Sequence, residues 1–272
     1  MSVAERREAK PALADPSHGK SFVFRLALLA AFPATLVLVW WLVAASVDSA
    51  VLNDPLEAFG QILASLQSPR YLESLLVTAQ TVAIAYIGAV LAGSLVGFAL
   101  GLSTFWRNAL GPLVQAIYSI PKITVFPLFL VFLGLSLTSR IAFAFVHGFF
   151  PIVIIIMGAT ANLRMNEIYL KLGASLKMSH LQLVRIVLLP AVLPSFLTAA
   201  RLGFGLTFLG AILAEMFSSN GGLGHELIRN MYDVRVDRIL AQVVLIAIIA
   251  IIPNAVLRMV EVRISRRMQG IQ

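Results

Sequence analysis

Six apolar runs, each about as long as a helix that crosses a bilayer, restrict how this chain can fold. They are Val23–Val47, Leu75–Leu100, Leu113–Leu135, Ile141–Thr160, Val187–Leu213 and Ile239–Val260. A helix needs about 20 residues to cross roughly 30 Å of hydrocarbon. Only 12% of the residues are charged, whereas soluble domains carry roughly 25%. The chain is therefore predicted to be an all-α integral membrane protein with six transmembrane helices, not a soluble α/β domain.

The first apolar run has two interpretations, a cleaved signal peptide or a retained helix. Its polar lead, Met1–Ser21, is long, and the run exceeds the roughly 7–15 apolar residues of a signal peptide. We expect a retained helix, preceded by a cytoplasmic arm over residues 1–22.

The lysines and arginines in the tails, in the loops and near the ends of the apolar runs predict which side of the membrane each loop faces. One side carries fourteen of them: Arg6, Arg7, Lys10, Lys20, Arg25, Arg107, Arg164, Lys171, Lys177, Arg185, Arg258, Arg263, Arg266 and Arg267. The other side carries five: Arg70, Arg140, Arg229, Arg235 and Arg238. Positive charge concentrates on the cytoplasmic side, so both termini are expected there. The domain plan is then a transmembrane domain over 23–260, with a cytoplasmic loop near 161–186 and a periplasmic loop near 214–238, and a cytoplasmic tail over 261–272.

Two short motifs look like enzyme motifs and lack a required residue. HGKS (His18–Ser21) ends like a phosphate-binding loop, but Ala14 stands where that loop needs glycine. HELIR (His225–Arg229) starts like a zinc protease helix, but Arg229 replaces the second histidine. The chain has no cysteine, which excludes thiol catalysis and zinc–thiolate sites. We expect no enzyme activity, metal or cofactor in this chain.

The acidic residues indicate how transport would be energised. All thirteen lie in tails, loops or the ends of apolar runs. Transporters driven by protons or sodium usually need carboxylates inside the membrane. The energy is therefore expected to come from a partner.

Three basic or titratable residues, Lys122, Arg201 and His147, lie deep within apolar runs. A charge inside the membrane costs several kcal/mol, on the order of 3 or more, unless it faces protein or water. Lys122 and Arg201 favour anions if they line a water-filled path. The alternative is structural, with both side chains bonded to backbone carbonyls freed near Pro121, Pro127 or Pro194.

Glycines at four-residue spacing, Gly93, Gly97 and Gly101, mark one face of the second run. Such spacing lets another helix approach closely. That helix belongs either to the same subunit or to a neighbouring one, and the spacing is equally typical of both.

A basic amphipathic segment, KLGASLKMSHLQLVRIVLLPAVLP (Lys171–Pro194), interrupts the apolar pattern on the predicted cytoplasmic side. It has three plausible uses: lying on anionic lipid, capping the bundle, or docking in a groove on a soluble partner.

This segment resembles the cytoplasmic loop of inner-membrane permeases of ATP-binding-cassette (ABC) importers. Their signature runs Glu-Ala-Ala, three residues, Gly, nine residues, Ile, one residue, Leu-Pro. Aligned on Leu189-Pro190, the length fits and Val187 takes the Ile place. Lys177 takes the Gly place, and Lys171-Leu172-Gly173 takes the Glu-Ala-Ala place. These lysines predict a partner groove that is more acidic than usual.

Three further blocks resemble permeases of the nitrate/sulfonate/taurine type: IPKITVFPLFLVFLG (Ile120–Gly134), LLPAVLPSFLTAARLGFG (Leu188–Gly205) and AEMFSSNGGLG (Ala214–Gly224). The resemblance implies a type I importer permease in the bacterial inner membrane, acting as a homodimer. It also implies two ATP-binding subunits, which hold ATP and magnesium, and a periplasmic substrate-binding protein. The implied ATPase-docking residues are Lys171, Leu172, Gly173, Ala174, Ser175, Lys177, Met178, Leu189 and Pro190. The implied contacts with the binding protein are Asn220, Gly221, Gly222 and Gly224.

The expected function is import of a small anion, such as a sulfonate, taurine or nitrate, by alternating access, with no role for nucleic acid. Three alternatives stay open. The first is a secondary transporter or channel that works alone. The second is an ABC permease for a thiamine-precursor pyrimidine, and the third is a membrane scaffold without transport activity.

Overall fold

The computed structural model of the chain describes residues 17–46, 53–165, 171, 173–217 and 221–269, and the regular elements in these ranges are helices. In chain order they are α1 (Ser17–Ser46), α2 (Pro55–Leu66), α3 (Pro69–Leu102), α4 (Thr104–Ser119), α5 (Lys122–Leu133), α6 (Leu137–Met165), α8 (His180–Gln182), the π-helix η1 (Leu183–Leu188), α9 (Leu189–Phe217), α10 (Leu223–Tyr232) and α11 (Val236–Gln269). The predicted all-helical class is confirmed.

The chain divides into two units, residues 1–58 and 59–272. The first contains α1, an apolar helix with Pro33 inside it. Near the end of α1, the indole N–H of Trp40 donates to the carbonyl of Asn53 at 3.1 Å. That bond holds Asn53 against α1 within this unit.

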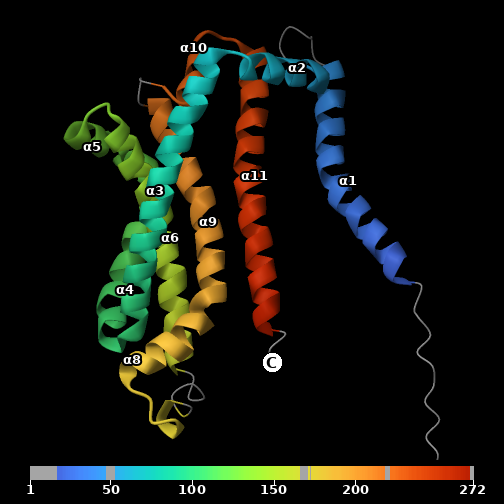
Figure 1. Ribbon diagram of the computed structural model, residues 1–272. Helices are drawn as coiled ribbons and strands as arrows, with labels where there is room; N and C mark the ends of the chain where they lie inside the picture. The colour runs from blue at the N-terminus through green and yellow to red at the C-terminus, as the bar shows by residue number, and fades with distance from the viewer. Residues whose placement is uncertain (1–16, 47–52, 166–170, 172, 218–220, 270–272) are drawn as a thin grey trace, which may run out of the picture. The chain divides into compact units, whose positions relative to one another are not determined.

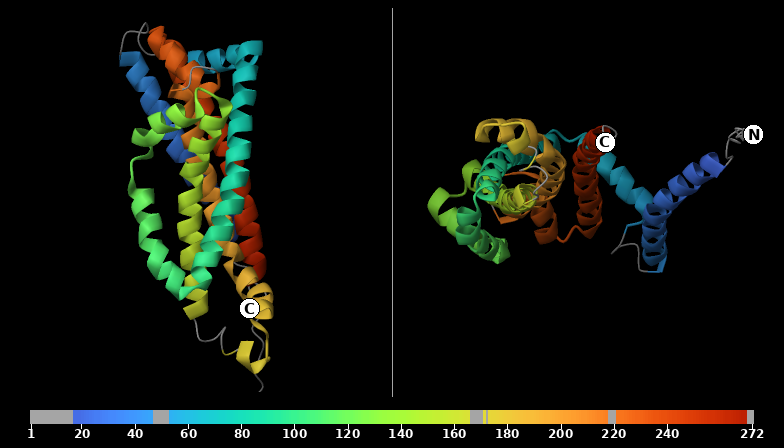
Figure 2. Two further views of the ribbon diagram at one scale, coloured as in Figure 1. Left: turned by 90° about the vertical axis from the view of Figure 1, so that its left-hand side faces the viewer. Right: turned by 90° about the horizontal axis from the view of Figure 1, so that it is seen from below.

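In the second unit α6 packs between α3 and α9, and α11 packs against α9 (Figures 1 and 2). At one end of this bundle α3 and α11 begin, α9 ends and α10 lies across them (Figure 1). We name it the α10 end. At the other end α3 and α11 finish and α8 and η1 lead into α9 (Figure 1). We name it the α8 end.

The glycine stripe on α3 packs against α6 of the same chain. A Cβ added at Gly97 would lie 2.8 Å from the carbonyl of Val153, and one at Gly101 would lie 2.8 Å from that of Met157. At Gly93 it would lie 3.0 Å from Ile152. Of the two alternatives that the spacing left open, packing within one subunit is the one observed.

The run Leu113–Leu135 is not one continuous helix, so that part of the expected pattern is wrong. Helices α4 and α5 are bent by 91° at a break between Ser119 and Lys122. Proline disfavours the helical conformation at the residue before it, and Ile120 is accordingly extended at φ −66° and ψ 130°. Pro127 lies inside α5 without breaking it.

Four helical stretches in the described residues are long and apolar enough to cross a membrane: Pro69–Leu102, Leu137–Leu163, Leu183–Phe217 and Val236–Arg267. The bent pair α4–α5 would make a fifth, and the apolar part of α1, Ala31–Ser46, is shorter. The four stretches contain the expected runs Leu75–Leu100, Ile141–Thr160, Val187–Leu213 and Ile239–Val260, which confirms those runs as helices.

Candidate functional site

The predicted docking segment turns sharply at Lys177. Lys171 and Gly173–Ser175 are helical, whereas Leu172 lies outside the described residues. The helix then stops, because the N–H of Met178 bonds the carbonyl of Gly173 at 2.9 Å and Lys177 has φ 49°. A left-handed residue after a helix is usually glycine, which has no Cβ to clash. The place where the family signature has Gly is thus a left-handed position that this chain fills with lysine.

After the turn, a helix starts and continues into the long apolar helix. Ser179 and Gln182 cap its first turn reciprocally, with Ser179 N–H donating to Gln182 Oε1 at 2.8 Å and Gln182 N–H donating to Ser179 Oγ at 3.3 Å. The π-helix η1 follows, and the N–H of Leu189, the residue directly after it, bonds the carbonyl of Val184 five residues back. Pro190 has no N–H to give to the carbonyl four residues back. The wider turns therefore fall just before Pro190, where the docking segment joins α9.

The segment exposes apolar side chains beside its lysines. Leu176, Leu181, Ile186 and Leu189 are all more than half exposed. Gly173 is instead buried, and a Cβ there would meet the side chain of Leu183. An exposed apolar row flanked by charges is typical of a partner-binding face.

Lys122 lies at the bend between α4 and α5. Its ammonium donates to the carbonyl of Tyr118 at 3.1 Å and lies 4.2 Å from the centre of the Tyr118 ring. The carbonyl lies one helical turn back, next to the break at Pro121. This contact has the form of the structural alternative stated for Lys122.

Arg201 joins α9 to α11 through an ion pair. Its Nε lies 2.6 Å from Oε2 of Glu261, and the hydroxyl of Thr198 donates to the same carboxylate. Both side chains of the pair are mostly buried, at 26% and 16% exposed. The partner is thus a carboxylate on another helix and not a backbone carbonyl near Pro194.

His147 is buried in α6 against α9. Its Nδ1 lies 3.0 Å from the carbonyl of Phe143, one turn earlier. A Cβ on Gly210 of α9 would lie 2.7 Å from the imidazole ring. Lys122, Arg201 and His147 therefore each bond a different partner, and their role in a path stays a prediction.

At the α10 end, Glu215 of α9 holds the turn that leads into α10. The hydroxyl of Thr78 and the backbone N–H of Gly224 both donate to its Oε2, at 2.8 and 3.0 Å. Thr78 in turn accepts from the N–H of Leu223 at 2.8 Å. Glu215 is completely buried. This carboxylate was not singled out in the sequence, although an acid between an apolar run and a glycine-rich stretch is a usable signal.

Two glycines in this turn have backbone angles that other residues rarely adopt. Gly221 has φ 123° and Gly222 has φ 104°. A Cβ on Gly222 would collide with the Glu215 carboxyl group. Arg140 of α6 donates to the carbonyl of Gly221 at 2.9 Å. Of the residues expected to contact a binding protein, Gly222 and Gly224 are buried in this chain, Gly221 is partly exposed, and Asn220 lies outside the described residues.

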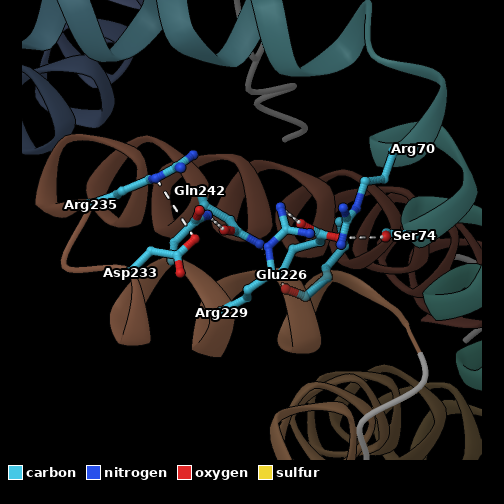
Figure 3. Close-up of polar contacts among 9 residues, drawn as sticks. Arg70, Ser74, Glu226, Arg229, Asp233, Arg235 and Gln242 are labelled. Atoms are coloured by element: carbon cyan, nitrogen blue, oxygen red, sulfur yellow. Dashed lines mark hydrogen bonds and ion pairs between the residues drawn. The ribbon is translucent and has the colours of Figure 1, made fainter.

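A second polar network ties α10 to α3 and α11 (Figure 3). Arg70 and Arg229 approach the Glu226 carboxylate from two helices, at 3.2 and 2.9 Å. On the α11 side, Asn230 donates to Gln242 and Gln242 donates to the carbonyl of Leu223, both at 2.7 Å. Together with the bond from Gly224 to Glu215 of α9, this network fixes the amphipathic helix α10 to three neighbours, α3, α9 and α11.

Comparison with known proteins agrees with this architecture. Residues 89–270 match the family model described as "Binding-protein-dependent transport system inner membrane component". The chain belongs to this family. It is therefore an inner-membrane transport permease rather than an enzyme, because ATP hydrolysis in ABC importers is carried by partner subunits.

Several relatives of this permease have named solutes. The taurine transport system permease protein TauC of Escherichia coli is 28% identical over 85% of this chain and 86% of its own length. The nitrate import permease protein NrtB of Synechococcus elongatus is 30% identical over 63% of this chain and 60% of its own length. The formylaminopyrimidine transport permease protein ThiX of Halalkalibacterium halodurans is 31% identical over 70% of this chain and 77% of its own length.

A solved structure supports the fold alone. The inward-facing MetNI methionine ABC transporter matches with a TM-score of 0.60 at 20% identity, covering 72% of this permease and 94% of the matched chain. The expected resemblance to ABC importer permeases of the nitrate, sulfonate and taurine type is confirmed.

Proposed function

We propose that this permease imports a small anionic solute, such as a sulfonate, taurine or nitrate, by alternating access. The observation that carries the proposal is that the chain belongs to the permease family and is similar to members named for the transport of taurine and nitrate. The basic residues Lys122 and Arg201 in the apolar helices are compatible with an anion and are the candidates for lining its path, with His147 as a third.

The proposed topology has six spans and both termini in the cytoplasm. The α10 end of the described bundle carries five arginines, whereas the α8 end carries nine lysines and arginines: Arg107, Arg164, Lys171, Lys177, Arg185, Arg258, Arg263, Arg266 and Arg267. The positive-inside rule then makes the α8 end cytoplasmic. The arm over 1–22, the membrane domain over 23–260 and the tail over 261–272 follow from this topology.

Two copies of the permease would form the path, with two ATP-binding subunits holding ATP and magnesium. The docking segment supports this assembly because Leu181, Ile186 and Leu189 of its exposed apolar row lie on the helix that runs through η1 into α9. The turn at Lys177 directly precedes that helix. Movement of the segment by an ATPase would therefore be transmitted directly to a membrane helix. A substrate-binding protein would deliver the solute at the α10 end, near Gly221.

Reconstitution in liposomes tests the docking. Permease, ATPase and binding protein together should take up labelled taurine or nitrate only with ATP. The pair Lys171→Glu and Lys177→Glu should abolish ATP-driven uptake and the binding of the ATPase, whereas Arg266→Glu, an exposed arginine at the same end, should preserve both. Uptake by the permease alone would contradict the proposal and favour a stand-alone transporter or channel.

A pyrimidine is the second candidate solute, because the ThiX relative is 31% identical over 70% of this chain. Competition separates the two classes. Excess taurine or nitrate should suppress uptake of a labelled anion, whereas excess formylaminopyrimidine should not. The reverse pattern would assign the permease to thiamine precursors.

A further inference from the structure

A polar pocket of about 300 Å³ lies at the α10 end, between the starts of α3 and α11 and the helix α10. Part of α2 completes its wall. Small-molecule sites begin at roughly this volume. Three arginines and two carboxylates line it: Arg70, Arg229, Arg238, Glu226 and Asp237.

The carboxylates of this pocket already have hydrogen-bond donors. Glu226 is buried, and its Oε1 accepts from Arg70 while its Oε2 forms an ion pair with Arg229. Ser74 adds a longer bond to Oε1 at 3.4 Å. Asp237 accepts from the side-chain amide of Gln61 at 3.1 Å. A cation would have to compete with the two arginines for Glu226, so the pocket is poorly suited to bind one.

The arginines, by contrast, retain donors. Each guanidinium has five N–H groups, and one nitrogen each of Arg70 and Arg229 bonds Glu226. Among the described residues, Arg238 makes no side-chain bond and is exposed. The forks of several guanidinium groups beside one cavity match the oxygens of an oxyanion. The lining charges leave one positive charge in excess, which suits a monoanion.

Tyr71 supplies an independent observation. It lines the same pocket and is only 8% exposed, yet within the described part of the chain its hydroxyl has no hydrogen-bond partner. Leaving a buried hydroxyl unpaired costs about 1–3 kcal/mol. This hydroxyl is shut off from solvent in the unliganded chain, and it gains a partner if the Tyr71 side chain turns toward the cavity and donates to a bound ligand.

We infer that this pocket is a binding site for a small monoanionic oxyanion, a sulfonate-like or nitrate-like group. The inference rests on the geometry of the pocket and holds whether or not the permease proves to import an anion. The oxyanion has two sources, a free solute or the phosphate of a lipid headgroup, because the pocket lies where the membrane helices α3 and α11 begin.

Calorimetric titration of the purified full chain with methanesulfonate in lipid-free maltoside micelles tests the site. Saturable binding is expected. Arg238→Gln should weaken it on the order of tenfold, as the loss of a charge-assisted hydrogen bond implies. Arg235→Gln is the matched control, because Arg235 lies three residues before Arg238, pairs with Asp233 and does not line the pocket. It should bind like the unaltered chain.

Tyr71→Phe separates binding from folding. Removing an unpaired buried hydroxyl should leave the thermal stability of the unliganded chain equal or higher, yet weaken methanesulfonate binding.

Repeating the titration of the unaltered chain in phosphatidylglycerol nanodiscs identifies the source of the oxyanion. Unchanged affinity assigns the site to a free solute, and loss of binding in the nanodiscs assigns it to lipid phosphate. Absence of binding in micelles, or equal effects of Arg238→Gln and Arg235→Gln, would overturn the inference.

Discussion

The carboxylate of Glu215 accepts a hydrogen bond from the backbone N–H of Gly224 at 3.0 Å, so the end of α9 holds the start of α10. The same oxygen accepts from Thr78 of α3. One buried acid thus joins three helices at the α10 end and fixes the glycine turn between α9 and α10. A loop that is expected to meet a binding protein is, in its buried part, a rigid extension of the bundle.

Replacing Glu215 should destabilise the permease. Glu215→Ala leaves the N–H of Gly224 buried without its acceptor and leaves the hydroxyl of Thr78 only the carbonyl of Ser74, at 3.2 Å. The expected cost is about 2–4 kcal/mol. Size-exclusion chromatography of detergent-solubilised protein after heating would measure the loss. Glu73→Ala, at an exposed acid on α3, should leave the melting temperature unchanged. Equal melting curves for the two variants would show that the network contributes nothing.

Exchanging the charges of Arg201 and Glu261 separates a structural role from a role in the path. Each single change, Arg201→Glu or Glu261→Arg, should destabilise the contact of α9 with α11, and the double exchange should recover about 1 kcal/mol of coupling. The readouts are thermal stability and reconstituted uptake. If Arg201 only holds the helices together, the exchange restores both. If it also contacts the anion, stability returns and uptake does not.

Lys177→Gly should stabilise the docking segment by about 1 kcal/mol, because glycine adopts the left-handed conformation without a Cβ clash. Lys171→Gly is the matched control with the opposite expectation, since glycine within a helix costs about 1 kcal/mol relative to a good helix former. Hydrogen exchange of the segment's amides would compare the two variants. Reduced protection in Lys177→Gly would contradict the observed backbone angle.

Gly97→Ala should destabilise the α3–α6 contact by about 1–3 kcal/mol, because the new methyl group would lie 2.8 Å from the Val153 carbonyl. Gly158 of α6 is the control, since a Cβ there meets nothing within 4 Å. Gly158→Ala should be neutral or slightly stabilising. Thermal unfolding of both variants in detergent checks the difference, and a neutral Gly97→Ala would argue against this helix pairing.

Much of the bundle could be predicted because its signals are local. Leu75–Leu100 and Ile239–Val260 are apolar over the length that a membrane helix needs, and the charged residues collect at the ends. The four-residue spacing of Gly93, Gly97 and Gly101 marked a close helix contact. The docking signature, anchored on Leu189-Pro190, identified the segment that leads into α9. None of these inferences required knowledge of which helix faces which.

The pairings and the break in the chain were not predictable in this way. Pro121 and Pro127 are alike in sequence, yet one ends a helix and the other lies within one. Arg201 and Glu261 are 60 residues apart, and Glu215 and Thr78 are 137 apart. Composition and periodicity encode whether a side chain avoids or tolerates lipid. Its partner depends on how α3, α9, α10 and α11 pack together, because the free energy of a buried charge depends on the groups that surround it in space.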